Sequence, residues 1–286
     1  MFSAKERIQE WIEHGDETAI LDLSYLKIEK LSELPANLQK LNCSNCDKLK
    51  EITELPANLQ ELDCSYCKNL KELPELPQKI QILNCSYCDN LKEIPELPAN
   101  LQIIECYCCD ELKELPELPL NLQKISCYDC PIEELPELPS NLQHLNCSLC
   151  PIKELPKLPP NLQLLACSNC PVEELPELSV NLQALRCSYC PIEELPQLPE
   201  SLHILYCFNC SKLKELPELP PNLQALRCSY CSKLKELPEL PESLQSLCCS
   251  YCPIENIPEL PVNLQELDCY RCPIKQLPPI LPTYVY

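Results

Sequence analysis

The sequence contains one glycine, Gly15, among 286 residues. Hairpin turns and left-handed backbone conformations depend mainly on glycine. The composition therefore predicts a chain that relies little on either. The same scarcity excludes the glycine-rich loops with which nucleotide enzymes hold phosphate groups.

Histidine is also scarce, and the three residues His14, His144 and His203 occupy unrelated positions. No serine, histidine and acidic residue are spaced as a catalytic triad would require. We therefore expect no enzymatic activity. No apolar run approaches the roughly 18 residues of a membrane span, and the first twenty residues are charged throughout, unlike a secretory signal. These absences predict a protein without membrane contacts.

Basic residues are outnumbered, with 23 Lys and Arg against 43 Asp and Glu, and the formal net charge is −20. Nucleic acids and anionic membranes bind clustered Lys and Arg, so neither is an expected partner. The simplest interpretation of the charge is solubility. Because 26 cysteines occur without a secretory signal, we expect a reducing compartment, the cytoplasm.

Proline, by contrast, is abundant, with 32 residues, and it excludes long helices and central strands over most of the length. One repeated unit accounts for this composition. An Asn-Leu-Gln element or a variant of it recurs every 20 or 21 residues, beginning at residues 37, 58, 79, 100, 121, 141, 161, 181, 201, 222, 243 and 263. The extra residue of the long units always follows the second cysteine, as Cys190–Pro196 and Cys231–Pro238 show. A fixed core with one adjustable corner is therefore predicted.

An earlier, less regular unit brings the number to thirteen, because Leu21–Leu26 aligns with Leu41–Cys46. We predict an N-terminal helix and linker at 1–20, thirteen repeats at 21–276 and a C-terminal tail at 277–286. Near the N-terminus, Ser3 and Glu6 have the spacing of a capping box, and Gly15 stands where a helix would end.

The residues between these caps, 3–14, carry Ile8, Trp11 and Ile12 at helical spacing. We expect a short amphipathic helix that covers the first coil, with a partner-binding helix as the alternative. The tail has no evident cap. It either folds over the last coil or leaves an open edge for association.

Each unit has the periodicity of a short strand followed by an extended segment. Leu185 and Cys187 alternate with Ala184 and Arg186, which predicts a strand with one buried face. In the following E-L-P-Q-L-P segment the leucines are three residues apart, the spacing of one face of polyproline II. Since a coil of twenty residues cannot bury its apolar face alone, the units must stack into a repeat solenoid.

The pattern L-x-x-L-x-C-x-x-C-x-(x)-L resembles the leucine-rich repeat. Its L-P-x-L-P-x-x-L-x-x-L phrasing resembles the short bacterial-effector subclass, the YopM and IpaH type. The L-x-C-S-x-C variant is closest in phrasing to leucine-rich repeat proteins of giant viruses. The resemblance implies a horseshoe with a concave parallel β-sheet, a polyproline II or irregular convex side, and a protein partner.

A viral or effector origin would imply a host–virus or host–pathogen interaction in the host cytoplasm. Some effectors of this type carry a ubiquitin-ligase domain after the repeats. Here the sequence ends at Tyr286, directly after the last coil, so we do not expect that activity.

Twelve units carry C-x-x-C, which places 24 of the 26 cysteines in two columns. In the first unit the same positions hold Leu23 and Leu26, so we predict apolar packing columns with no metal and no cofactor. The alternative is a metal-binding or redox-buffering protein, because neighbouring units bring together four thiols such as Cys187, Cys190, Cys207 and Cys210. Outside the columns, Cys108 and Cys248 are expected to be exposed and the most reactive.

Tyrosine and arginine are concentrated around the first cysteine of each unit, on the predicted outward side of the strands. The position directly before that cysteine varies most, and in the later units it holds Arg186, Tyr206 and Arg227. Tyr and Arg dominate binding hot spots. The predicted partner-binding residues are Arg186, Tyr189, Tyr206, Phe208, Arg227, Tyr230 and Tyr251.

The simpler alternative for the tyrosines is a ladder that only shields the sheet. The sequence thus favours a non-enzymatic protein-binding scaffold. A second alternative for its function is a substrate-recognition subunit that docks into a larger assembly through its last coil.

Overall fold

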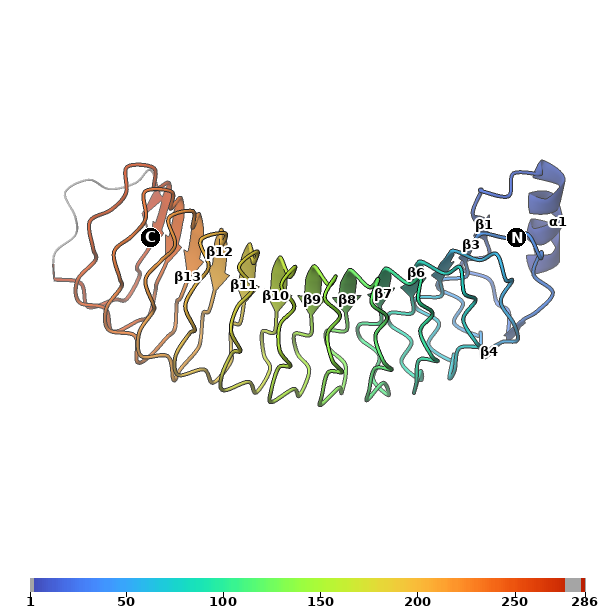
Figure 1. Ribbon diagram of the computed structural model, residues 1–286, viewed down its shortest axis with the longest axis horizontal. Helices are drawn as coiled ribbons and strands as arrows, with labels where there is room; N and C mark the ends of the chain where they lie inside the picture. The colour runs from blue at the N-terminus through green and yellow to red at the C-terminus, as the bar shows by residue number, and fades with distance from the viewer. Residues whose placement is uncertain (1–2, 276–283, 286) are drawn as a thin grey trace. The chain divides into compact units, whose positions relative to one another are not determined.

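The computed structural model describes residues 3–275 and the backbone of residues 284 and 285. It divides into two compact units, Met1–Leu142 and Gln143–Tyr286, which are described separately. In each unit the chain winds in successive coils, and each coil contributes one short strand to a parallel sheet (Figure 1).

The first unit begins with the helix α1 and continues with a parallel sheet whose strands follow chain order. Its helix spans Ala4–His14, and its strands are β1 (Leu21–Asp22), β3 (Lys40–Asn42), β5 (Glu61–Asp63), β6 (Ile82–Asn84), β7 (Ile103–Glu105) and β8 (Lys124–Ser126).

The second unit is built in the same way, again with its strands in chain order. They are β9 (His144–Asn146), β10 (Leu164–Ala166), β11 (Ala184–Arg186), β12 (Ile204–Tyr206), β13 (Ala225–Arg227), β14 (Ser246–Cys248), β15 (Glu266–Asp268) and β16 (Tyr284–Val285). Stacked coils with one parallel strand each confirm the predicted solenoid.

The alternation of buried and exposed residues within each strand shows where the core lies. In β12 the central Leu205 is fully buried, while Ile204 and Tyr206 are partly exposed. The next residue whose side chain faces the core is Cys207, which is also fully buried. Its backbone N–H donates to the carbonyl of Arg227 at 2.8 Å, so the ladder continues beyond the strand. Strand residues with one buried face were predicted, and this part of the prediction is confirmed.

A left-handed residue follows each strand of the large sheet from β1 to β15, from Tyr25 to Arg271, at φ between 54° and 63°. The expectation that a chain with one glycine makes little use of such turns is therefore wrong. An L-residue in this conformation costs about 1–2 kcal/mol. The structure offsets the cost with a hydrogen bond between coils: the N–H of Tyr189, for example, donates to the carbonyl of Phe208 at 2.9 Å.

A second, two-stranded sheet joins β2 (Lys30–Leu31) and β4 (Glu51–Ile52) on the other side of the first coils. The residue after each strand is Ser32 or Thr53, whereas later coils have proline there, first at Pro74. The N–H of Thr53 donates to the carbonyl of Leu31 at 3.0 Å. Proline has no N–H, so this pairing stops where the prolines begin.

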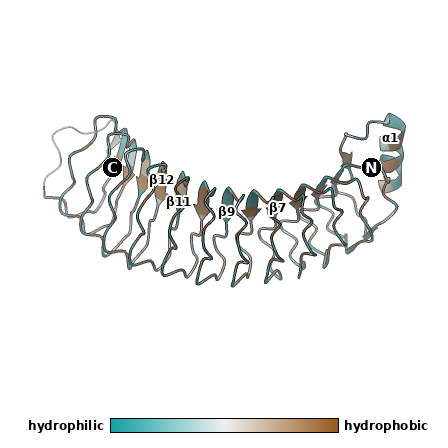
Figure 2. Cartoon of the chain, viewed as in Figure 1, coloured by the Kyte–Doolittle hydropathy of each residue, from teal (hydrophilic) through white to brown (hydrophobic). Residues whose placement is uncertain are grey.

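The helix α1 has the predicted caps. The side chains and backbones of Ser3 and Glu6 form a capping box, and Gly15 is left-handed, with φ of 74°. Trp11 is buried, and its indole N–H donates to the carbonyl of Ala19 at 3.0 Å. Hydrophilic and hydrophobic residues alternate along α1 (Figure 2). Ile12, which was expected on the covered stripe, is 50% exposed.

The asparagine of the Asn-Leu-Gln element also links coils. Its side-chain amide donates to a carbonyl of the preceding coil, as in Asn181 to Pro160 at 2.9 Å and Asn222 to Glu200 at 3.0 Å. Where serine replaces it, as at Ser201 and Ser243, the hydroxyl donates instead. The motif that defines the repeat therefore joins each coil to its neighbour.

Two further predictions concern membrane contact and the C-terminal tail. No helix in the described part of the chain has the length and apolar character that crossing a membrane requires. The predicted tail, 277–286, lies outside the described residues except for the backbone of β16, which pairs in parallel with β15.

Candidate functional site

The second cysteine of each unit forms a ladder of hydrogen bonds between coils. The Cys210 thiol donates to the carbonyl of Cys187 at a sulfur–oxygen distance of 3.2 Å, and Cys231 to that of Cys207 at the same distance. The pattern begins with Cys46, which donates to the carbonyl of Leu23. These thiols therefore join neighbouring coils by hydrogen bonds as well as packing in the core. The sequence analysis predicted only the packing.

The first unit explains why leucine can replace such a cysteine. Leu26 belongs to the first coil, so no earlier coil presents a carbonyl to it. The first column packs beside the strand leucines, as the fully buried Cys187 and Cys207 show. Leu23 is equally buried in that column, so a packing role fits it.

The chemistry of the thiols follows from their burial. Removal from water raises the pKa values of Cys85, Cys207 and Cys228 well above the usual range, which keeps the thiols protonated. Within the described residues, no three His, Cys, Asp or Glu side chains are grouped so that they could hold a metal ion.

The two cysteines outside the columns do not behave as predicted. Cys108 is the left-handed turn residue after β7 rather than a strand residue, and both Cys108 and Cys248 are only partly exposed. Burial raises the pKa of each thiol. At Cys272, in contrast, contact with the Cys249 thiol lowers the pKa to about 7. The more acidic thiol therefore lies in the last described coil.

The predicted partner-binding residues all lie in the second unit, on its strand face, meaning the outward side chains of the strands and of the turns after them. Arg186, Tyr206 and Arg227 are in direct register on β11, β12 and β13. Tyr189, Tyr230 and Tyr251 are left-handed turn residues rather than strand residues. Phe208 precedes the left-handed residue of its own turn.

The first three of these residues form a compact group. The guanidinium carbon of Arg186 lies 5.5 Å from the ring centre of Tyr206, and that of Arg227 lies 4.9 Å from the same centre. One tyrosine ring thus contacts two cations, an arrangement favoured by the charge distribution of the ring. Both arginines are exposed.

The neighbouring rings form two smaller groups. Tyr189 meets Phe208 edge to face with centres 4.7 Å apart, and Tyr230 stacks on Tyr251 at 4.4 Å. The three tyrosines are each between 37% and 49% exposed, so these contacts leave large apolar areas open to solvent. We refer to the seven residues together as the Arg/Tyr surface.

The position before the first cysteine has a structural role in several other coils. There an Asn or Asp accepts a hydrogen bond from the backbone N–H two residues later, as Asn84 does from Ser86 at 3.1 Å and Asn146 from Ser148 at 3.2 Å. Such side chains stabilise turns. Arginine has no acceptor atom, and the tyrosine hydroxyl is too far from the backbone. At Arg186, Tyr206 and Arg227, as at Ala166, the side chain does not accept this bond, and the N–H of Ser188 donates instead to the hydroxyl of Ser168 at 3.2 Å.

Charge further distinguishes the strand face of the second unit. From β9 through β14, the strands and the turns after them contain no Asp or Glu, and the first carboxylates on this face are Glu266 and Asp268 of β15. The corresponding face of the first unit carries Glu61, Asp63 and Glu105. In a chain of net charge −20, the Arg/Tyr surface is therefore locally cationic.

One group of tyrosines in the first unit belongs to the outward side chains noted in the sequence but not to the predicted partner-binding residues. Tyr66, Tyr87, Tyr107 and Tyr128 form consecutive ring contacts with centres 4.2, 5.4 and 4.6 Å apart. Hydrogen bonding to Tyr128 raises the pKa of the Tyr87 hydroxyl. The available signal was the run of tyrosines in successive coils. Because these rings pack against one another across the coils, two pairs stacked and one edge to face, they match the alternative of a ladder that shields the sheet.

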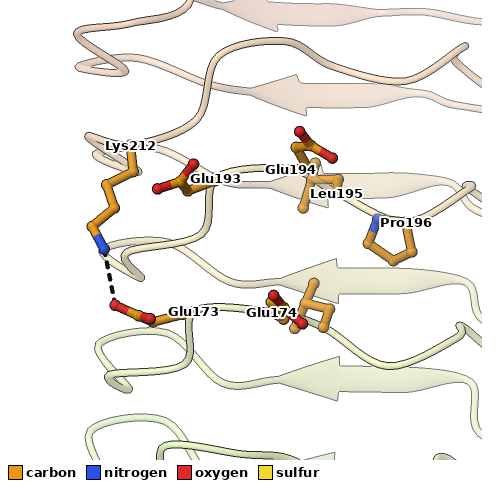
Figure 3. Close-up of a pocket in the computed structure, with 8 residues that line it drawn as sticks. Glu173, Glu174, Glu193, Glu194, Leu195, Pro196 and Lys212 are labelled. Carbon is orange, nitrogen blue, oxygen red and sulfur yellow. Dashed lines mark hydrogen bonds and ion pairs between the residues drawn. The ribbon is translucent and has the colours of Figure 1, made fainter.

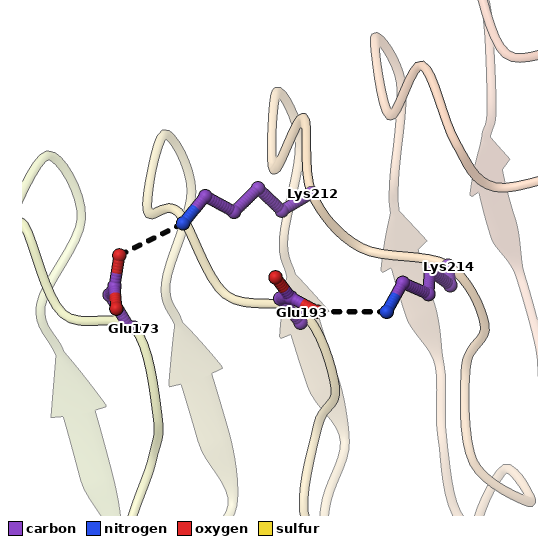
Figure 4. Close-up of polar contacts among 4 residues, drawn as sticks. All are labelled: Glu173, Glu193, Lys212 and Lys214. Atoms are coloured by element: carbon purple, nitrogen blue, oxygen red, sulfur yellow. Dashed lines mark hydrogen bonds and ion pairs between the residues drawn. The ribbon is translucent and has the colours of Figure 1, made fainter.

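A groove of about 510 Å³ lies away from the strand face of the second unit, between the extended segments of adjacent coils (Figure 3). Four glutamates line it, Glu173, Glu174, Glu193 and Glu194. Lys212 pairs with Glu173 at 2.9 Å, and Lys214 with Glu193 at 2.8 Å (Figure 4). Half of its carboxylates thus have cationic partners within the protein.

Comparison with known proteins identifies the repeat. The family model described as Leucine Rich Repeat matches residues 58–80. YopM from Yersinia enterocolitica has a similar structure, with 31% identity and a TM-score of 0.77 over 90% of this chain and 60% of that one. This chain has the leucine-rich repeat fold.

The likeness to YopM extends to a second structure. The leucine-rich effector YopM from Yersinia pestis is 29% identical, with a TM-score of 0.71 over 97% of this chain and 89% of that one. The resemblance to the bacterial-effector subclass is thus confirmed. CroV588, a circular leucine-rich repeat protein, also matches at 18% identity, with a TM-score of 0.47 over 88% of this chain and 46% of that one. No curated protein matches the sequence.

Proposed function

We propose that this leucine-rich repeat protein is a non-enzymatic scaffold that binds a partner protein through the Arg/Tyr surface of its second unit. Protein binding is typical of the fold. The observation that carries the proposal is the exchange at Arg186, Tyr206 and Arg227, where side chains suited to binding replace the turn-stabilising Asn or Asp of other coils.

The exposed aromatic area supports the same site. Tyr189, Tyr230 and Tyr251 project from turns whose left-handed backbone is costly for any residue with a side chain. Large rigid aromatics next to arginine are the composition of binding hot spots. The thiol ladder needs reduced cysteines, and the solved relatives include an effector protein. By that likeness we place the action of the protein in a reducing cytoplasm, that of the host if a pathogen encodes it.

The proposal is tested by affinity capture from a reduced cytosolic extract. The wild type is compared with a variant that carries Arg186→Ala, Tyr206→Ala, Arg227→Ala and Tyr230→Ala. A matched control carries Lys153→Ala, Lys157→Ala, Val180→Ala and Val262→Ala, all exposed positions away from the strand face. Circular dichroism and thermal melting establish that all three proteins are folded.

We expect a partner that the wild type and the control capture equally and the site variant captures at least tenfold less. Equal capture by all three proteins would place the interface elsewhere. Loss with the control variant as well would show that the effect is not specific to the Arg/Tyr surface.

A further inference from the structure

The unpaired charge of Arg186 and Arg227 indicates what the Arg/Tyr surface binds. Among the residues that the structure describes, neither guanidinium forms an ion pair, although eight lysines elsewhere in the chain do. Both arginines are exposed, and the strands and turns around them carry no carboxylate from β9 through β14. The protein itself supplies no anion for them.

The two cations have a defined separation. Arg186 and Arg227 are in register on β11 and β13, with β12 between them. Neighbouring strands lie about 4.8 Å apart, so the two side chains start about 10 Å apart. Tyr206 holds one guanidinium at 5.5 Å and the other at 4.9 Å from its ring centre, which fixes them on either side of the ring. A single carboxylate is too small to contact both.

An extended peptide with two carboxylates matches this separation. In polyproline II, residues three apart lie on the same face and are about 9 Å apart, whereas residues two apart in a β-strand are about 7 Å apart. Aromatic side chains on either side of the arginines, Tyr189, Phe208 and Tyr230, offer faces on which proline rings pack, as in other grooves that bind polyproline II segments.

The geometry points to an acidic, proline-rich segment of the partner, in the polyproline II conformation, with carboxylates three residues apart. It lies across β11, β12 and β13, and one carboxylate binds each guanidinium. This inference rests on the proposed function, because it specifies the partner of the same surface. It excludes basic partners, which the overall charge of −20 would otherwise favour.

The test measures the binding of three synthetic octapeptides to the wild-type protein by isothermal titration calorimetry at low salt. The first has the sequence P-P-E-P-P-E-P-P, the second replaces both glutamates by glutamine, and the third, P-P-P-E-E-P-P-P, has the same charge with adjacent glutamates. We expect the first peptide to bind at least fivefold more tightly than either of the others. This preference should shrink as salt screens the ion pairs.

Charge reversal makes the test independent of folding defects. A folded variant with Arg186→Glu and Arg227→Glu should lose the preference and favour P-P-K-P-P-K-P-P. A control with Lys153→Glu and Lys157→Glu makes the same charge change on exposed residues away from this surface, and it should keep the wild-type preference.

Three results of the peptide titrations would overturn the inference. The wild type could bind the glutamate and glutamine peptides equally, the adjacent glutamates could bind as well as the spaced ones, or the reversed variant could keep the glutamate preference. If the captured partner is still lost with the alanine variant, the proposed function stands and only the acidic partner is wrong. A self-association abolished by Arg186→Glu and Arg227→Glu would instead assign the surface to the E-L-P-E-L-P segments of a second copy, and also overturn it.

Discussion

At the scale of single residues, the position before the first cysteine shows how stability and binding compete in this protein. Asn84 and Asn146 accept a backbone hydrogen bond within their own turn. Arg186 and Arg227 cannot accept one, and they lie exposed beside Tyr206. The same backbone position therefore serves the fold in some coils and is available for a partner in others.

Arg227→Asn should stabilise the protein and weaken the proposed binding. The new side chain can accept from the N–H of Ser229, as Asn84 does from Ser86, and a net hydrogen bond contributes about 0.5–1.5 kcal/mol. Urea denaturation measures the change. Arg227→Gln is the control, because its longer side chain cannot close the same turn. If Arg227→Asn is less stable than the wild type, the arginine itself supports the fold and the argument for binding fails.

The two cysteine columns should respond differently to the same substitution. Cys187→Ala and Cys210→Ala each remove one fully buried sulfur. Only Cys210→Ala also leaves the carbonyl of Cys187 without its thiol donor. We expect Cys210→Ala to lower the free energy of unfolding by about 1 kcal/mol more than Cys187→Ala does. Thermal melting of both variants under reducing conditions checks this. Equal losses of stability would show that the thiols of the second column contribute packing only.

At the scale of structural elements, proline decides where strands pair. The sheet of β2 and β4 exists because Thr53 has an N–H to donate to Leu31, and it is not extended where the next coil has Pro74. The helix α1 illustrates the opposite case, an element fixed by local chemistry. Its capping box and its left-handed Gly15 lie within the segment itself, so the sequence predicts its limits closely.

Thr53→Pro should remove the small sheet. It deletes the 3.0 Å bond from the Thr53 N–H and the 3.1 Å bond from its hydroxyl, both to the Leu31 carbonyl. A loss of about 1–2 kcal/mol is expected, partly offset by the lower entropy of the unfolded chain. Ser32→Pro is the matched control, because the sheet begins with β2. Amide hydrogen exchange around Lys50–Thr53 follows the outcome, and unchanged protection in Thr53→Pro would contradict it.

At the scale of the whole molecule, the charge and the repeat act together. Stacking brings the same acidic positions of successive coils next to one another, as Glu173 and Glu193 show in the groove of the second unit. Exposed ion pairs such as Glu193 with Lys214 contribute little individually. Repulsion among like charges is therefore the larger electrostatic effect on stability.

The melting temperature should rise with salt. Screening weakens the repulsion in a chain of net charge −20, and between roughly 10 mM and 200 mM NaCl the Debye length falls from about 30 Å to about 7 Å. Differential scanning calorimetry at constant pH measures the change. A fall in melting temperature over this range would show that the ion pairs between coils outweigh the repulsion.

The sequence by itself determined the repeat, its register, the buried face of each strand and the capped helix. Each of these depends on contacts within one unit or on the spacing of apolar residues, which are properties of the linear chain. The candidate residues were also visible, because Arg186, Tyr206 and Arg227 vary at a position within an otherwise uniform unit.

Only the tertiary structure decided what joins the coils. The left-handed turns at Tyr189 and its equivalents, the bonds from cysteine thiols to carbonyls, and the placement of Tyr206 between two guanidiniums all link residues about twenty positions apart. Most of these links involve backbone donors and acceptors, which are the same for nearly every residue type. A backbone group has no signature in the sequence, so its partner is defined only when the coils stack.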